Sequence, residues 1–244
     1  MRPPIYAIYG FVRLADEIVD SFHAYDKVLL LAELRRDCFN AIERGISVNP
    51  VMNSFQQVVN QYNISLELVD LFLQSMEMDL KPQEYTAEKY DQYILGSAQV
   101  VGLMCLQVFI HGDQDQYELL RESAMRLGSA FQKVNFLRDL QADHQELQRS
   151  YFPEVDLHAF TNEDKRHIEN DIRADFDAAL HGINQLPLSC RRGVYLAYVY
   201  YKKLFQKISR KSASSILSGR IRVSNGHKFW LLCNSFLRFK MNVL

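Results

Sequence analysis

Residues 4–20 read PIYAIYGFVRLADEIVD, and apolar side chains recur in this stretch at intervals of three and four residues. This spacing places the apolar residues from Ile5 to Val19 along one face of an α-helix. The three-and-four pattern continues through most of the chain, whereas strand-like alternation is nearly absent. The sequence therefore predicts an all-α fold.

Prolines, of which there are 6, mark most of the places where helices begin or end. Expected helices cover residues 4–22, 27–45, 51–62, 65–80, 86–111, 115–148, 163–184, 189–208 and 226–241. Their connections are short, without a low-complexity linker or an internal repeat, so we predict a single domain over residues 1–244. The uncharged stretch from Gln92 to Gly112 is long enough to cross a membrane, but its glutamines favour a helix buried inside a bundle.

Composition excludes several classes of function. A net charge of −1 offers no electrostatic basis for binding nucleic acid. The seven histidines show neither an HxxxH nor an HExxH pattern, which disfavours zinc. No signal peptide pattern is visible, and the cysteines have no CxxC pair, so we expect reduced thiols in a cytoplasmic protein. The four cysteines are Cys38, Cys105, Cys190 and Cys233.

The first acidic pair is Asp16 and Asp20, which lie four residues apart and project from one helix face, one turn above the other. Arg13 shares that face. Carboxylates can hold a divalent cation, and a guanidinium can grip phosphate oxygens, so this arrangement suits capture of a diphosphate. A solvated helix face with a local ion pair explains the same spacing.

The second acidic pair is Asp139 and Asp143, in the stretch LGSAFQKVNFLRDLQAD at residues 127–143. Gln132 and Asn135 extend it into a polar stripe on an otherwise apolar helix. Two such helices facing each other would gather four carboxylates around hard divalent cations. An ordinary polar surface is an equally good interpretation of the spacing alone.

Both motifs, in this order and at this separation, resemble those of the squalene/phytoene synthase family of head-to-head isoprenyl synthases, and the pattern is closest to its bacterial phytoene synthase branch. Residues 149–153 (RSYFP) continue the second signature. Further similarities are residues 76–79 (MEMD), 101–104 (VGLM) and 219–223 (GRIRV). The resemblance covers essentially the whole chain and implies an isoprenoid-synthase helical bundle with a central cavity.

The resemblance also implies the chemistry. Mg²⁺, with Mn²⁺ as an alternative, would bind the diphosphates of two prenyl donors and help the leaving group depart. The implied metal ligands are Asp16, Asp20, Asn135, Asp139 and Asp143. The implied catalytic residues are the four aspartates and Tyr93. The implied substrate-binding residues are Arg13, Gln132, Asn135, Arg138, Arg149 and Tyr151.

Two departures from the family pattern stand out. The family has a further segment, with a Ser-Phe stretch, ahead of the first aspartate pair. We expect that this chain is a fragment or has a misplaced start; the alternative is a protein that lacks this wall of its pocket. The family also has one or two tyrosines before a Val-Ala-Gly stretch. Tyr93 matches the outer one, but Leu95 and Gly96 stand nearer the small residues. Ala142, where many members have glutamate, is a milder change.

The expected function is condensation of two geranylgeranyl diphosphates to phytoene through a cyclopropyl diphosphate intermediate, with release of diphosphate and without NADPH. The alternatives are a squalene or dehydrosqualene synthase that uses farnesyl diphosphate, and a non-catalytic relative that acts as a membrane-associated assembly factor. Basic residues between 202 and 222 suggest peripheral contact with the inner face of the membrane. A solvated basic surface explains them as well. The sequence indicates no oligomeric state.

Overall fold

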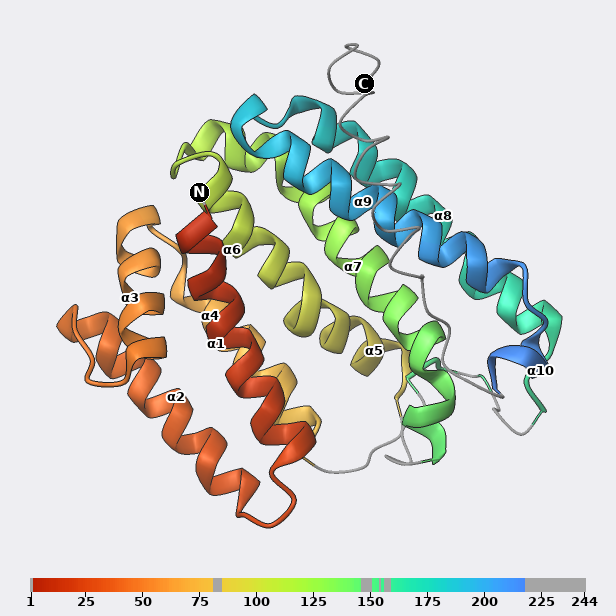
Figure 1. Cartoon of the computed structure of the whole chain (residues 1–244), viewed down its shortest axis with the longest axis horizontal. Coiled ribbons are helices and arrows are strands. Elements are labelled where there is room, and N and C mark those ends of the chain that lie inside the picture. The colour runs from red at the N-terminus through yellow and green to blue at the C-terminus, as the bar shows by residue number, and fades with distance from the viewer. Residues whose placement is uncertain (1, 81–84, 146–150, 154, 156–158, 218–244) are drawn as a thin grey trace. The chain divides into compact units, whose positions relative to one another are not determined.

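A computed structural model describes residues 2–80, 85–145, 151–153, 155 and 159–217; the side chains of residues 141–145 fall outside the described part. Every regular element in these residues is helical, which confirms the all-α prediction (Figure 1). The elements are α1 (Arg2–Ser21), α2 (Lys27–Arg44), α3 (Pro50–Tyr62), α4 (Leu66–Met78), α5 (Ala87–Ile94), the π-helical turn η1 (Leu95–Gln99), α6 (Val100–Phe109), α7 (Gln114–Gln145), α8 (Asn162–Gln185), α9 (Leu188–Ser209) and α10 (Ala213–Ile216). The helix expected at 226–241 lies outside the described residues.

Side-chain caps explain why the helices begin where they do. The carboxylate of Asp26 accepts a hydrogen bond from the backbone of Leu29 at the start of α2, and the side chain of Asn49 does the same for the start of α3. Thr161 and Asp164 form a reciprocal capping box at the start of α8. Each cap satisfies amide groups that the first helical turn leaves unpaired.

Contacts divide the chain into two compact units, and the single-domain interpretation stays a prediction. The first unit comprises Met1–Gln83 and Gln92–Arg121. Within it, α1 packs against α2, α3, α4 and α6. Three fully buried rings form the centre of this packing: Phe11 stacks on Phe55 at 4.0 Å between ring centroids and lies 5.5 Å from Phe72. The apolar face of α1 is therefore fixed against the unit's core.

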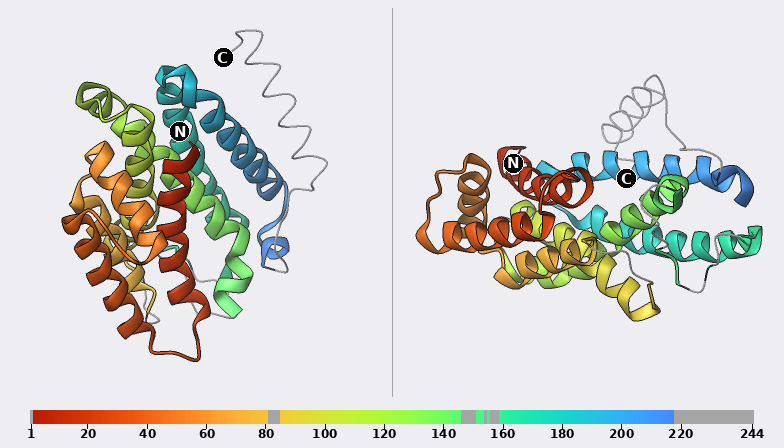
Figure 2. Two further views of the ribbon diagram at one scale, coloured as in Figure 1. Left: turned by 60° about the vertical axis from the view of Figure 1, so that its left-hand side comes forward. Right: turned by 90° about the horizontal axis from the view of Figure 1, so that it is seen from below.

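The second unit comprises Glu84–Asp91 and Glu122–Leu244. Here α8 and α9 pack along each other, as both views in Figure 2 show. Phe176 of α8 is almost fully buried and lies near Phe131 of α7 and near Tyr198 and Phe205 of α9, with centroid distances of 5.5–6.4 Å. This aromatic centre joins α8 to α7 and α9.

The described cysteines agree with the expectation of reduced thiols. Cys38, Cys105 and Cys190 are free, and burial raises their pKa to about 12, 12 and 11. Such thiols carry little thiolate at neutral pH and are chemically inert. Cys233 lies outside the described residues.

The helix expected at 86–111 is interrupted by the π-helical turn η1, which the sequence did not predict. Within the described residues, Ala87–Phe109 is the one helical stretch long and apolar enough to cross a membrane, and half of its apolar window is buried inside the protein. That burial agrees with the interpretation of this stretch as an interior helix.

Gly96 lies in η1 against α4. A Cβ at this position would come within 2.6 Å of the carbonyl oxygen of Leu71 and of the Cβ of Ser75. Real Cβ atoms do not approach neighbours so closely, so the backbones of η1 and α4 can meet only because residue 96 has no side chain. A tyrosine therefore has no room at position 96.

We expect Gly96→Ala to lower the free energy of unfolding by about 1–3 kcal/mol, because the added methyl group would push η1 away from α4. The matched control is Gly193→Ala. Gly193 lies on the exposed face of α9 with no atom within 4 Å of its added Cβ, so this change should leave stability equal or raise it by about 0.5–1 kcal/mol. Urea denaturation followed by circular dichroism measures both. Equal effects of the two substitutions would contradict the packing argument.

Candidate active site

The first acidic pair lies near the C-terminal end of α1, on the helix that the phenylalanine core holds in place. Asp16 is half-buried and Asp20 is exposed. Arg13 donates to Glu17 one turn along the helix, and more than half of its side chain is exposed. The structure therefore brings the two predicted aspartates and the arginine onto one segment of α1, and it adds Glu17 as the arginine's partner.

The pKa of Asp16 is raised to about 6, mainly by burial and next by the negative charge of Asp20. Arg13 acts in the opposite direction, while Asp79 and Glu17 add to the increase. The charged form of Asp16 is thus disfavoured by desolvation and by carboxylates around it. A bound divalent cation would relieve this repulsion, so the donor set of α1 fits a hard metal ion that prefers carboxylate oxygens.

Asp79 belongs to the MEMD stretch at residues 76–79 but was not predicted as a site residue. It forms the C-cap of α4, where it is buried. The hydroxyl of Tyr93 on α5 donates to Asp79 Oδ2 at 2.6 Å, and Tyr93 is buried as well. The structure therefore gives the predicted Tyr93 a carboxylate partner, in the same unit as the first acidic pair.

The second motif lies on the part of α7 that belongs to the second unit. Gln132, Asn135, Arg138 and Asp139 are all half-buried. Arg138 Nε donates to both carboxylate oxygens of its neighbour Asp139, at 3.0 and 3.1 Å. Burial lowers the pKa of Arg138, but the hydrogen bond and the charge of Asp139 outweigh it, so the net shift is upward. Arg138 is therefore held as a cation beside the motif carboxylate.

Tyr201 of α9 contacts the same segment at two points. Its ring stacks on Phe131 with 4.0 Å between centroids, and its hydroxyl donates to Asn135 Oδ1 at 3.4 Å. These two α7 residues are one helical turn apart. Tyr201 was not predicted from the sequence, because only the fold shows that α9 packs beside this part of α7.

Of three further predicted residues, the structure describes the side chain of one, Tyr151. Asp143 lies within α7, but its side chain is not described, and Arg149 lies outside the described residues. Tyr151 is buried and stacks on Phe136 at 4.1 Å, with Tyr85 5.1 Å away. Its ring thus belongs to an aromatic cluster with Tyr85 and with Phe136 of α7. The similarity at 219–223 also falls outside the described residues.

Among the described side chains, no group of three or more histidines, cysteines, aspartates or glutamates is arranged to hold a metal ion. Each motif by itself offers oxygen ligands of the kind that Mg²⁺ accepts: two carboxylates on α1, and the amide of Asn135 with the carboxylate of Asp139 on α7. Mg²⁺ usually keeps several waters and is completed by substrate phosphates. The chemistry of both donor sets fits this mode of binding.

Comparison with known proteins agrees with the family resemblance of the sequence. The family model described as squalene/phytoene synthase matches residues 1–227. The chain is 28% identical to a phytoene synthase of Rhodobacter capsulatus, over 96% of this chain and 73% of the relative. It is also 28% identical to a presqualene diphosphate synthase of Rhodopseudomonas palustris, over 64% of this chain and about half (55%) of the relative.

Solved structures with a similar fold include a dehydrosqualene synthase in complex with ligand and the squalene synthase HpnC of Alicyclobacillus acidocaldarius. The first has a TM-score of 0.78 and 19% identity, with 98% of this chain and 87% of that chain covered. The second has a TM-score of 0.74 and 20% identity, with 86% and 83% covered. At these identities the likeness concerns the fold, which is that of the isoprenoid synthases.

The raised pKa of Asp16 predicts a specific pH dependence. In the folded protein Asp16 binds its proton more tightly than in the unfolded chain, so stability is lost as the pH rises from about 4 to about 6. With a chelator present, Asp16→Asn should therefore raise the free energy of unfolding at pH 7 by at most about 3 kcal/mol, and the gain should vanish toward pH 4. Urea denaturation across this range measures it.

The control for this experiment is Asp115→Asn, which removes an exposed aspartate at the start of α7. We expect it to show no such pH-dependent gain. A loss of stability in Asp16→Asn at pH 7, or a gain that is the same at pH 4 and pH 7, would contradict the electrostatic account.

Proposed function

The chain belongs to the squalene/phytoene synthase family of prenyltransferases, and we propose that it is a phytoene synthase that joins two geranylgeranyl diphosphates head to head. The observation that carries the proposal is the match to the Rhodobacter capsulatus phytoene synthase, which extends over 96% of the chain. Both acidic motifs are present within the matched sequence. The products would be phytoene and two diphosphates, formed through a cyclopropyl diphosphate intermediate.

We assign the metal ligands by motif. Asp16 and Asp20 on α1, and Asn135, Asp139 and Asp143 on α7, would hold Mg²⁺ together with the substrate diphosphates. When bound, Mg²⁺ supplies Lewis-acid stabilisation of the departing diphosphate.

The cationic and amide side chains of the motifs would bind the phosphate oxygens that the metal leaves free. Arg138 is suited to this role because its pairing with Asp139 keeps it charged while half-buried. Arginine donates from a planar fork that matches phosphate geometry. Arg13 and Gln132 are assigned the same role, and Arg149 and Tyr151 remain predicted substrate-binding residues.

Tyr93 is assigned to the carbocation steps. Its phenol donates to Asp79 at 2.6 Å, and a hydrogen bond to a carboxylate increases the electron density on the phenol oxygen. Such an oxygen can stabilise an allylic cation or pass its proton to Asp79 while it accepts one from the substrate. The buried location of both groups keeps water from this part of the site.

A second candidate function is presqualene diphosphate synthesis from two farnesyl diphosphates, which would stop at the cyclopropyl intermediate or continue to a C30 product. It is favoured by the similarity to the Rhodopseudomonas palustris enzyme. The same motifs would serve both reactions, which differ in the length of prenyl chain accepted and in whether the cyclopropyl intermediate is released or rearranged. Peripheral contact with a membrane stays a prediction for either function.

The test is incubation of the full chain with labelled geranylgeranyl or farnesyl diphosphate and Mg²⁺, with and without NADPH. We expect a C40 hydrocarbon from the C20 substrate without reductant. A C30 product or presqualene diphosphate would replace the proposal by the second candidate. No product from either substrate, from a folded protein to which the expected upstream segment has been restored, would favour a non-catalytic relative.

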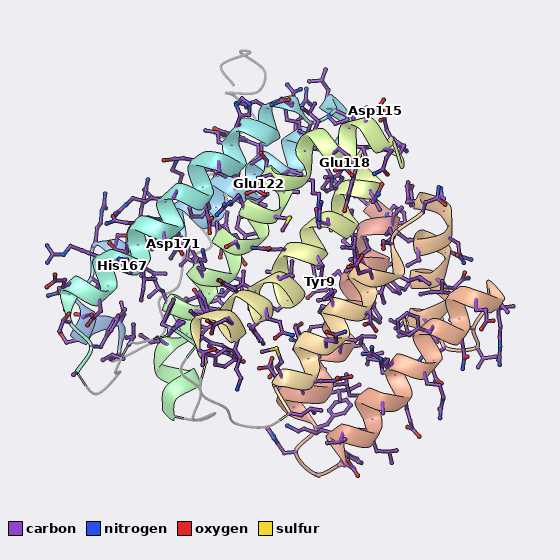
Figure 3. The ribbon with its side chains drawn as sticks, turned by 180° about the vertical axis from the view of Figure 1, so that it is seen from behind. Tyr9, Asp115, Glu118, Glu122, His167 and Asp171 are labelled. Atoms are coloured by element: carbon purple, nitrogen blue, oxygen red, sulfur yellow. The ribbon has the colours of Figure 1, made fainter. Side chains whose placement is uncertain are left out.

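We expect Asp16→Ala and Asp139→Ala each to lower turnover by about 100-fold or more, because each removes a metal ligand. Circular dichroism should show an unchanged helical content. Asp115→Ala is the matched control: this aspartate lies on α7, far along the sequence from the motif, and is labelled in Figure 3. Turnover that survives in Asp139→Ala at the wild-type level would refute the assignment of the second motif.

A further inference from the structure

A buried ion-pair network joins α7 to α8 in the second unit, beside the second motif but apart from its predicted residues. Asp175 of α8 has an exposed fraction of 0%. It accepts hydrogen bonds from three α7 side chains: Ser129 Oγ at 2.7 Å, Lys133 Nζ at 2.7 Å and Arg126 Nη1 at 3.1 Å. Lys133 Nζ also lies 2.6 Å from a carboxylate oxygen of Asp171, which Figure 3 labels.

Stability alone does not account for such a network. Taking a carboxylate and an ammonium out of water costs several kcal/mol per ion, and their attraction roughly returns this cost. Apolar side chains of similar volume commonly give equal or greater stability in such positions. What a buried ion pair supplies in addition is a preferred geometry, because it is satisfied in only one arrangement of the two helices.

The three donors lie at positions i, i+3 and i+7 of α7, so they share one face of the helix. The polar stripe of the motif is interleaved with them: Lys133 directly follows Gln132 and precedes Asn135 by two residues. Each residue turns an α-helix by about 100°, so a rotation of α7 that broke the contacts to Asp175 would turn the stripe by the same angle. The side chains of the network and of the stripe therefore move together when α7 rotates.

We propose that Asp175 is a positioning residue, which holds the motif segment of α7 in one rotational setting against α8 by accepting hydrogen bonds from Arg126, Ser129 and Lys133. Asp175 thereby fixes the orientation of the polar stripe of Gln132, Asn135 and Asp139. That this orientation matters for diphosphate binding rests on the proposed function. Tyr201 of α9 contacts the same segment from another helix, at Phe131 and Asn135.

The test separates positioning from stability by replacing the whole network with apolar groups. The variant Ser129→Ala, Lys133→Met, Asp175→Leu leaves no buried donor or charge without a partner, because Arg126 and Asp171 are about half-exposed and can be solvated. We expect a Tm within about 4 °C of the wild type. Asp175→Asn alone should lower the Tm by more than this, since it leaves Lys133 with one counter-charge fewer.

Two measurements on the triple variant then test the proposal. Hydrogen exchange should be at least about 10-fold faster than in the wild type for amides of residues 129–140, where the network is lost. The affinity for inorganic pyrophosphate with Mg²⁺, measured by calorimetry, should fall by about 10-fold or more. Unchanged exchange and unchanged affinity at a restored Tm would overturn the proposal and leave the network as a stabilising contact only.

The matched control removes another buried pair of the same unit. Lys165 and Glu169 form a salt bridge within α8, and both are nearly fully buried; their other described hydrogen bonds join Glu169 to Arg173 of α8 and Lys165 to the backbone of Ser209 in α9. Lys165→Met with Glu169→Leu should leave the exchange of residues 129–140 and the pyrophosphate affinity at wild-type values. If this control changes them as much as the triple variant does, the positioning role of Asp175 is refuted.

Failure of the proposed function gives a different result. A wild-type chain that neither binds pyrophosphate with Mg²⁺ nor forms product would refute the function. The exchange measurement would still decide whether Asp175 fixes α7.

Discussion

The constraint on which the rest depends is the electrostatic cost of holding carboxylates together where water is partly excluded. On α1 this cost appears directly in Asp16, whose pKa is raised by burial and by the charge of Asp20. A helix with such a pair needs stabilising contacts elsewhere. In α1 these are supplied on the opposite, apolar face, where Phe11 stacks on Phe55. The stability gained in the core offsets the repulsion in the site.

The second motif meets the same constraint in another way. Asp139 is accompanied by a guanidinium from its own neighbour, Arg138, so its charge is balanced locally. The helix that carries it is held by polar contacts to Asp175 and by the aromatic contact of Tyr201. Of the charges that act on Asp16, that of Asp20 has the largest effect on its pKa, and it is repulsive. A bound cation would therefore relieve more electrostatic repulsion at the first motif than at the second.

The helices were predictable because their signals are local. Asp26, Asn49 and Thr161 cap helices within a few residues of the expected positions, and the apolar spacing identifies the buried faces. The aspartates of both motifs lie on helices as expected. The contacts that organise them were not predictable, since they join residues far apart in sequence: Asp175 lies 42 residues from Lys133, and Tyr201 lies 66 from Asn135. The turn η1 escaped prediction because it depends on the approach of α4 to Gly96.

The same approach bears on the family's missing tyrosines. Gly96 has no room for a side chain, so a phenol cannot stand there without moving η1. The phenol that the described residues do place in this region is Tyr93, three residues earlier, and Asp79 holds it through a short hydrogen bond. A phenol paired with a buried carboxylate is a better proton acceptor than one in water. Tyr93 and Asp79 are therefore the phenol and carboxylate to which the proposed function assigns the proton chemistry.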